Sequence, residues 1–377
     1  MRLVIISNMS HYRRADGAIV GHGATARELD ALATLFDEVR HVACLHDEPA
    51  PGDALPYAAA NLALVPVPPA GGDDLAAKLG ILRHTPRYVQ TIARELAGAD
   101  AVHVRAPANI SLYAIAMLTA RRTPRRRWIK YAGNWQPHGS EPASYRLQRA
   151  WLAGPVHRAQ VTINGSYADQ PAHVHSFDNP CLTDDELALG RAAATTKRLT
   201  APVRLLFVGH LGAAKNPRVA IDLLAELRRG GADAQLDVVG DGADLPALRA
   251  HAAASGLAAS VIFHGALPRP ALAPLYATAH FVVLPSRTEG WPKVLGEGMA
   301  AGAVPIATAV GSIPEVLGRL ATGTAVATPT APAFTAAIRN YLVDPARWRR
   351  ESQAAAAAAE RFSYGHYLRS VTALLDL

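Results

Sequence analysis

The chain has 377 residues and a net charge of +7, with 50% hydrophobic and 18% charged residues. This composition predicts a packed globular protein, and the length is enough for two domains. The positive charge is spread over both halves of the chain, which argues against a nucleic-acid-binding face. No run approaches the roughly 20 apolar residues that would span a bilayer, and Cys44 and Cys181 show neither metal spacing nor a disulfide framework. We therefore expect a cytoplasmic protein.

Short apolar runs alternate with amphipathic helical patterns along the chain. In the first half, strands are expected at 2–8, 39–45, 61–66, 100–105 and 127–132, and helices at 23–37, 86–98 and 109–121. In the second half, strands are expected at 203–209, 235–240, 261–265, 281–285 and 304–308, and helices at 216–229, 244–255, 269–278, 292–301 and 331–343. This alternation predicts an α/β fold with two doubly wound, Rossmann-like domains, each a parallel sheet covered by helices.

The expected first domain covers residues 1–180 and ends at the turn signal Asn179-Pro180. A linker is expected at 181–202, because this segment lacks a strand pattern. The second domain is expected at 203–361, and a last helix at about 362–377. Two such domains facing a central cleft predict a ligand beyond the carboxyl ends of the strands.

The segment from Pro285 to Glu297 carries the strongest chemical signal, because it follows an expected strand and opens an expected helix. Pro292 suits the first turn of that helix, where a missing amide hydrogen is no loss. Amides near the helix start, together with the helix dipole, form a site for phosphate oxygens. These amides belong to Trp291, Lys293 and Val294.

Glu289 and Glu297 can bind different parts of one elongated ligand. A carboxylate accepts hydrogen bonds from both vicinal hydroxyls of a sugar or a ribose. A solvated helix face would also explain two glutamates at this spacing. However, Glu297 is flanked by apolar and small residues such as Leu295, Gly296 and Met299, which are typical of helix packing. We therefore expect both glutamates to bind a ligand.

Two further loops lead from a strand into a helix in the second half. Lys215 stands in the first of them and is one of only five lysines, so we expect it to contact a diphosphate as a compact charge. In the second, Gly311 and Ser312 offer backbone amides to the same phosphates, with a plain turn as the alternative. In the first half, Gly17, Gly21 and Gly23 precede a helix and are expected to let the backbone approach a phosphate.

An arginine cluster stands before the expected strand at 127–132. It comprises Arg121, Arg122, Arg125, Arg126 and Arg127. A solvated helix end is the plain interpretation. The alternative is a patch that holds an anionic acceptor or contacts an acidic membrane surface, which would place the protein peripherally at the inner face of a membrane.

The run from Glu289 to Glu297 resembles the E-x7-E motif of retaining glycosyltransferases with the GT-B fold, in particular glycosyltransferase family 4. The similarity extends over most of the second half of the chain, whereas the first half matches only around Gly21 and Gly23. The other matching segments are 208–215, 239–242, 263–265 and 311–315. In this family the last helix crosses back onto the first domain, so we expect the same for residues 362–377.

The resemblance implies a role for each matching residue. Glu289 would bind the hydroxyls of the transferred sugar, and Glu297 those of the ribose. Lys215 would neutralise the diphosphate, assisted by backbone near Gly23, Gly290 and Gly311. The base would lie against Gly265 and Leu267, near Asp241. The donor would be a UDP-sugar or a GDP-sugar, and the reaction would retain anomeric configuration without a divalent metal or other cofactor.

Three departures from the family pattern concern details of the site. His210 stands where the family usually has an arginine, and histidine is a weaker, pH-dependent cation. Trp291-Pro292 replaces the more usual Phe-Gly, which removes one backbone donor. A family histidine after the fifth strand is missing, so Asn134 or Trp135 is expected on the acceptor side, with His138 as a further candidate.

The expected function is transfer of a sugar to an acceptor that the residues do not identify. The acceptor is a growing glycan, a lipid-linked intermediate or a small metabolite. Two alternatives remain, a nucleotide-sugar epimerase with the same fold and a non-catalytic nucleotide-sugar-binding protein. An oxidoreductase is disfavoured, because the dinucleotide-binding G-x-G-x-x-G sequence is absent.

Overall fold

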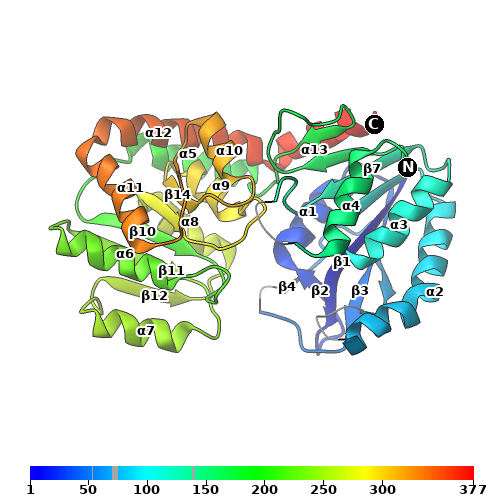
Figure 1. Ribbon diagram of the computed structural model, residues 1–377, viewed down its shortest axis with the longest axis horizontal. Coiled ribbons are helices and arrows are strands. Elements are labelled where there is room, and N and C mark those ends of the chain that lie inside the picture. Colours follow the sequence, from blue (N-terminus) through cyan, green and yellow to red (C-terminus); the bar gives the residue numbers. More distant parts are fainter. Residues whose placement is uncertain (53, 70–74, 138–140) are drawn as a thin grey trace. The chain divides into compact units, whose positions relative to one another are not determined.

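The computed structural model describes residues 1–52, 54–69, 75–137 and 141–377, which divide into two compact units (Figure 1). The first unit comprises Met1–Phe177 together with Leu368–Leu377, and the second comprises Asp178–Tyr367. Across these described ranges, no helix is both long and apolar enough to cross a membrane.

The first unit is built on β1 (Arg2–Arg13), whose residues Leu3–Ile6 are fully buried. All the following strands run parallel to β1. On one side of β1 lie β3 (Glu38–His46) and then β5 (Leu62–Val67). On the other side lie, in order, β6 (Ala101–Ala106), β7 (Arg126–Tyr131), β8 (Gln160–Ile163) and β9 (Val174–Ser176). The end of β1 also pairs antiparallel with β2 (Ile19–His22), which pairs with β4 (Ala54–Pro56). The helices are α1 (Gly23–Ala33), α2 (Leu75–Ala97), α3 (Asn109–Ala120) and α4 (Ala143–Ala153).

The second unit has a parallel six-stranded sheet in the order β12-β11-β10-β13-β14-β15. Its strands are β10 (Val203–Val208), β11 (Ala234–Val239), β12 (Val261–Gly265), β13 (Phe281–Leu284), β14 (Val304–Thr308) and β15 (Thr324–Val326). Every residue of β13 and β14 is buried, as expected for parallel strands with both faces covered. The strand order reverses between β10 and β13, which makes the carboxyl ends of these two strands the topological switch point.

Helices precede, connect and follow the strands of the second unit. They are α5 (Asp184–Thr196), α6 (Arg218–Arg229), α7 (Leu245–Ala254), α8 (Ala273–Thr278), α9 (Lys293–Ala300), α10 (Ile313–Leu320), α11 (Ala331–Val343), α12 (Pro345–Ala358) and α13 (Tyr364–Leu375), with the short 3-10 helices η1 (Arg269–Leu272) and η2 (Ala359–Phe362). The last ten residues of the chain, which include most of α13, belong to the first unit.

The structure confirms the predicted fold class and all ten predicted strands. It adds β2, β4, β8, β9 and β15, each of only three or four residues. Such short strands contain too few residues for a hydrophobic period to be visible.

The linker expected at 181–202 is wrong as a description of this segment, because it contains α5. Thr183 and Glu186 form a capping box, in which the Thr183 hydroxyl accepts from the Glu186 amide and the Glu186 carboxylate accepts from the Thr183 amide. A Cβ on Gly190 would lie 2.7 Å from the Ala300 carbonyl oxygen, so α5 packs tightly on α9. The segment is therefore an integral layer of the second unit.

The prediction of a glycine-rich, phosphate-binding loop in the first unit is also wrong in part. Gly21 lies within β2, opposite His11 of β1 and Leu55 of β4. A Cβ at Gly21 would lie 2.6 Å from Met9 Cε and 2.9 Å from His11 Cδ2. This glycine therefore makes room for side chains of the neighbouring strand rather than for a phosphate, whereas Gly23 does begin α1.

The arginine cluster does not form one exposed patch. Arg127 is 3% exposed and donates to the carbonyl oxygens of Pro124, Leu118, His157 and Arg121. Arg126 donates to the carbonyl oxygens of Leu375 and Asp376 within the same unit. Of the five arginines, only Arg122 and Arg125 are exposed. The expected membrane or acceptor patch thus loses the side chains at its centre to structural hydrogen bonds.

Candidate donor site in the second unit

Lys215 and Glu289 meet at the switch point of the second sheet. The Lys215 loop follows β10 and the Glu289 loop follows β13, which are adjacent strands. The Lys215 Nζ lies 2.5 Å from the Glu289 Oε1, and the Glu289 side chain is 10% exposed. The two loops are also joined through the backbone, because the Arg287 amide donates to the Ala214 carbonyl oxygen at 2.8 Å. A cation and a carboxylate predicted independently are thus brought into one site.

Gly311 holds the Glu289 loop from the other side. Its φ is +59°, and a Cβ here would lie 2.1 Å from the Glu289 carbonyl oxygen and 2.6 Å from that of Gly290. The Ser312 amide and hydroxyl both donate to the Gly290 carbonyl oxygen, at 3.1 and 2.9 Å. The prediction that the Ser312 amide binds a phosphate is therefore wrong for this conformation. Ser312 positions the loop that carries Glu289.

The start of α9 differs from the sequence-based prediction in the position of Pro292. Trp291 is 7% exposed, and its ring stacks on Phe362 with centroids 5.0 Å apart. The Trp291 side chain is therefore part of the hydrophobic core, and the phosphate contact predicted for its backbone amide stays a prediction. Pro292 is the N-cap rather than the first helical residue, and Lys293 and Val294 begin the first turn. Their amides lie where the helix dipole is positive.

The loops that were predicted to surround the nucleotide base of the donor are joined by backbone hydrogen bonds at the carboxyl edge of the sheet. The Leu211 amide donates to the Asp241 carbonyl oxygen at 2.9 Å, and the Gly240 amide donates to that of Gly265 at the same distance. His210 is exposed in the first of these loops. Leu267 is partly buried against the core of the unit. The predicted roles of His210, Asp241, Gly265 and Leu267 stay predictions.

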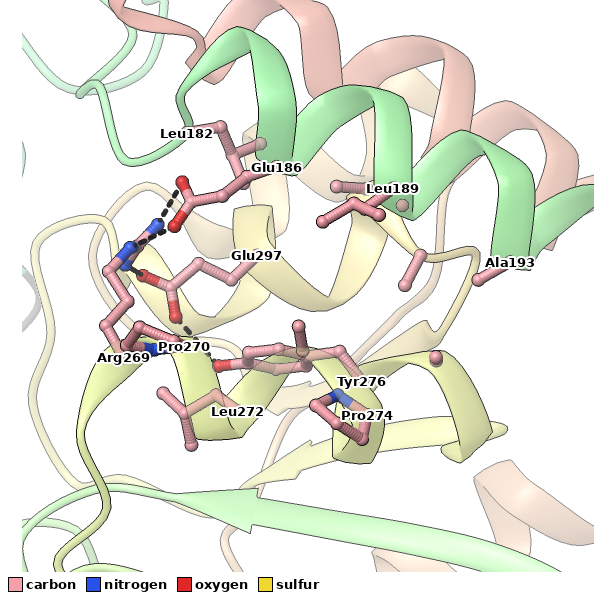
Figure 2. Close-up of a pocket in the computed structure, with 15 residues that line it drawn as sticks. Leu182, Glu186, Leu189, Ala193, Arg269, Pro270, Leu272, Pro274, Tyr276 and Glu297 are labelled. Atoms are coloured by element: carbon pink, nitrogen blue, oxygen red, sulfur yellow. Dashed lines mark hydrogen bonds and ion pairs between the residues drawn. The ribbon is translucent and has the colours of Figure 1, made fainter.

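Glu297 is engaged with protein groups rather than open to solvent. Its side chain is 9% exposed, its Oε1 accepts from Arg269 Nη1 at 2.5 Å, and its Oε2 accepts from the Tyr276 hydroxyl at 2.8 Å. Figure 2 shows this chain of contacts continuing from the Arg269 guanidinium to the Glu186 carboxylate. Sequence reasoning missed Arg269, Tyr276 and Glu186, although the capping box of Glu186 was visible as Thr183-Asp184-Asp185-Glu186.

A cavity of about 360 Å³ borders this polar chain (Figure 2). One wall is formed by α5, which contributes Leu189 and Ala193, and the opposite wall by Leu272 and Pro274. The cavity is thus apolar along its length, with charged groups at one end.

The first unit contains a second cavity, of about 470 Å³, at the carboxyl ends of β6 and β7 and beside Ser7–Ser10 of β1, which follow the last β1 residue paired with β6. This is the switch point of its sheet, because the strand order reverses between β1 and β6. Its lining includes Ser7, Ser10, Thr25, Arg105, Ala132 and Tyr145. None of these residues was predicted from the sequence to bind a ligand.

The acceptor-side residues predicted from sequence lie differently. Trp135 is 8% exposed and packs edge-on against Tyr131, with ring centroids 5.6 Å apart, so its side chain belongs to the core. Asn134 is half-buried and its side-chain oxygen accepts from the Gln136 amide. Neither residue lines the cavity, although the neighbouring Ala132 and Gly133 do. His138 lies outside the described residues.

Comparison with known proteins finds a family resemblance in the second unit. Residues 195–361 match the family of glycosyl transferases group 1. The chain is 31% identical over 162 residues to a D-inositol 3-phosphate glycosyltransferase of Segniliparus rotundus, covering 42% of this chain and 36% of that protein. It is 32% identical over 162 residues to a glycogen synthase of Mycobacterium tuberculosis, covering 43% of this chain and 39% of that protein. The chain thus spans about two fifths of the length of the curated relatives it matches.

Solved structures match over nearly the whole chain. A sucrose-phosphate synthase from Thermosynechococcus elongatus has a TM-score of 0.70 at 19% identity, covering 99% of this chain and 98% of that one. Anabaena HepE, solved in complex with UDP and glucose, has a TM-score of 0.66 at 16% identity, covering 100% and 99%. At these identities the likeness concerns the fold, which is GT-B. Residues 195–361 therefore resemble the glycosyl transferases group 1, and the chain as a whole has the GT-B fold.

Proposed function

We propose that this protein transfers a sugar from a UDP-sugar or a GDP-sugar to an acceptor, with retention of anomeric configuration and without a divalent metal. The observation that carries the proposal is the Lys215–Glu289 pair at the switch point of the second sheet. The nature of its relatives supports it, since they are sugar transferases and synthases by name, and the HepE structure holds UDP and glucose.

In this proposal the donor diphosphate replaces Glu289 as the partner of Lys215. The Glu289 carboxylate then accepts hydrogen bonds from hydroxyls of the sugar. As the bond between the sugar and the diphosphate breaks, negative charge develops on the leaving group. A fixed cation and the positive end of α9 stabilise that charge most strongly in the transition state. The acceptor attacks from the face that the diphosphate leaves.

Ligand-dependent thermal stability tests the donor class. We expect the melting temperature to rise with one of UDP or GDP and with its sugar conjugate, equally with and without EDTA, because a ligand that binds only the folded state stabilises it. NAD is the control ligand. A rise with NAD alone, or with none of these compounds, would remove the support for a nucleotide-sugar site.

For the acceptor, we propose the cavity of the first unit. It lies where ligands bind in open α/β sheets, and it combines hydroxyl groups of Ser10 and Thr25 with the Arg105 guanidinium. These groups suit an acceptor that presents hydroxyls, whether glycan, lipid-linked intermediate or metabolite. The acceptor-side role thereby moves from Asn134 and Trp135 to the ends of β6 and β7 and the neighbouring Ser7–Ser10 of β1.

Ala132→Leu is expected to raise the KM for the acceptor about tenfold, because a larger side chain at this exposed cavity position takes space from the ligand. Candidate glycans, lipid-linked intermediates and metabolites are first screened for transfer with the wild-type protein. Donor hydrolysis should be unchanged, since only the backbone amide of Ala132 is bonded, to the Ala106 carbonyl oxygen. Ala97→Leu, at an exposed position at the end of α2, is the control. An unchanged acceptor KM would place the acceptor elsewhere.

A further inference from the structure

Both oxygens of the Glu297 carboxylate are bonded before any ligand binds. Oε1 accepts from Arg269 at 2.5 Å, and Oε2 accepts from the Tyr276 hydroxyl at 2.8 Å. We infer that Arg269 and Tyr276 are positioning residues, which orient Glu297 so that its remaining lone pairs face the two vicinal hydroxyls of the donor ribose. This inference rests on the proposed function and adds to it the residues that determine selection of a ribonucleotide.

Arg269 is itself held on several sides. Its Nε and Nη2 donate to the two oxygens of Glu186, at 2.5 and 2.8 Å, and its Nη2 also donates to the Cys181 carbonyl oxygen (Figure 2). Glu186 in turn accepts from the Thr183 amide at 2.9 Å. A planar guanidinium bonded in this way has one orientation. The Nη1 contact to Glu297 therefore has a defined direction.

Tyr276 keeps its proton and acts as a donor. The residue is 6% exposed, and burial raises the pKa of its hydroxyl well above the usual value, with the Glu297 carboxylate acting in the same direction. For Arg269, burial alone would lower the pKa, but the carboxylates of Glu186 and Glu297 outweigh burial and raise it. Both groups therefore remain hydrogen-bond donors at neutral pH.

The number of lone pairs on the Glu297 carboxylate shows how many further hydrogen bonds it can accept. An ionised carboxylate has about four acceptor positions, and two of them are used by Arg269 and Tyr276. One position remains on each oxygen, which suits a pair of vicinal hydroxyls. Because the side chain is already ordered, a ligand does not have to order it on binding.

The polar groups beside Glu297 favour a ligand that donates hydrogen bonds. Arg269 lies between the carboxylates of Glu186 and Glu297, and a ribose hydroxyl can donate to a carboxylate, whereas a hydrogen at the same carbon cannot. The same arrangement should therefore accept a 2′-hydroxyl and disfavour a 2′-hydrogen.

The test compares the binding of UDP with that of 2′-deoxyuridine 5′-diphosphate, and of GDP with 2′-deoxyguanosine 5′-diphosphate, by calorimetry. The wild-type protein should prefer the ribonucleotide of the pair it binds by about tenfold or more, as expected for a hydrogen bond to a charged group. In Tyr276→Phe and in Arg269→Lys this preference should fall to about threefold or less, with the loss confined to the ribonucleotide. If Arg269 and Tyr276 had a purely structural role, their substitution would weaken the binding of ribonucleotide and deoxyribonucleotide equally. The ratio of the two affinities would then be the same as in the wild type.

Tyr341→Phe is the matched control. The Tyr341 hydroxyl also bonds a glutamate of the second unit, at 2.5 Å from Glu351 Oε2, but it lies on α11 rather than beside α9. The Tyr341→Phe variant should prefer the ribonucleotide as strongly as the wild type does. Tyr276→Phe removes a single hydroxyl, so it keeps the test valid if Arg269→Lys does not fold.

The outcomes separate the inference from the proposed function. If the wild-type protein binds neither UDP nor GDP, the proposed function fails and the inference fails with it. If it binds one of them with a ribonucleotide preference that survives in both variants, the positioning role is wrong and the donor site stands. Equal binding of ribonucleotide and deoxyribonucleotide by the wild type would also overturn the positioning role.

Discussion

Glu289→Gln is expected to lower the rate of sugar transfer by about a thousandfold while UDP or GDP binding changes by only a few fold. The amide loses the negative charge and half of the acceptor capacity that the sugar hydroxyls and the transition state require. Binding of the nucleoside diphosphate should persist, because Lys215 loses its ion-pair partner and remains available to the phosphates. Single-turnover transfer at saturating donor, with calorimetry of the diphosphate, separates the two effects.

Glu315→Gln controls for the loss of a carboxylate in the same unit. Glu315 pairs with Arg319 at 2.7 Å, one turn along α10, and is separate from the Lys215–Glu289 pair. An exposed pair of this kind contributes about 0.3–0.5 kcal/mol, so transfer should match the wild type. Wild-type turnover in Glu289→Gln would contradict the role proposed for this residue.

Gly311→Ala should lower the free energy of unfolding by about 2–4 kcal/mol and reduce transfer by about a hundredfold. The new Cβ would lie 2.1 Å from the Glu289 carbonyl oxygen at a φ of +59°, so the loop that carries Glu289 must move. A displacement near 1 Å is enough to misplace a reacting group. Denaturant unfolding and transfer kinetics measure the two quantities.

Gly318→Ala is the control for this substitution. Gly318 lies within α10, and a Cβ there would meet nothing within 4 Å. Alanine in a helix interior is more favourable than glycine by about 0.5–1 kcal/mol, so this variant should be slightly stabilised and fully active. Equal stability of the two variants would show that the close approach of Gly311 to the Glu289 loop is relaxed in solution.

The two α/β units were predictable from the order of the residues, because parallel strands buried on both faces appear as continuous apolar runs. Residues 281–285 and 304–308 are such runs, and helices of visible period separate them. The positions of Lys215 and Glu289 at strand-to-helix loops were also predictable. Parallel strands bring such loops to one edge, so their pairing follows from topology.

The surroundings of Glu297, in contrast, depend on how distant segments pack together. Arg269 comes from η1, Tyr276 from α8 and Glu186 from α5, segments that were predicted as one helix and a linker. Contacts between side chains so far apart in the sequence produce no periodic pattern of residues. The contacts around Glu297 could therefore not be predicted from any local pattern. The same holds for Ser312, whose amide donates to the Gly290 carbonyl oxygen, and for Gly21, which lies in β2 between β1 and β4. Hydrogen-bond partners and close approaches are properties of packing, whereas strand and helix positions are properties of local hydrophobic order.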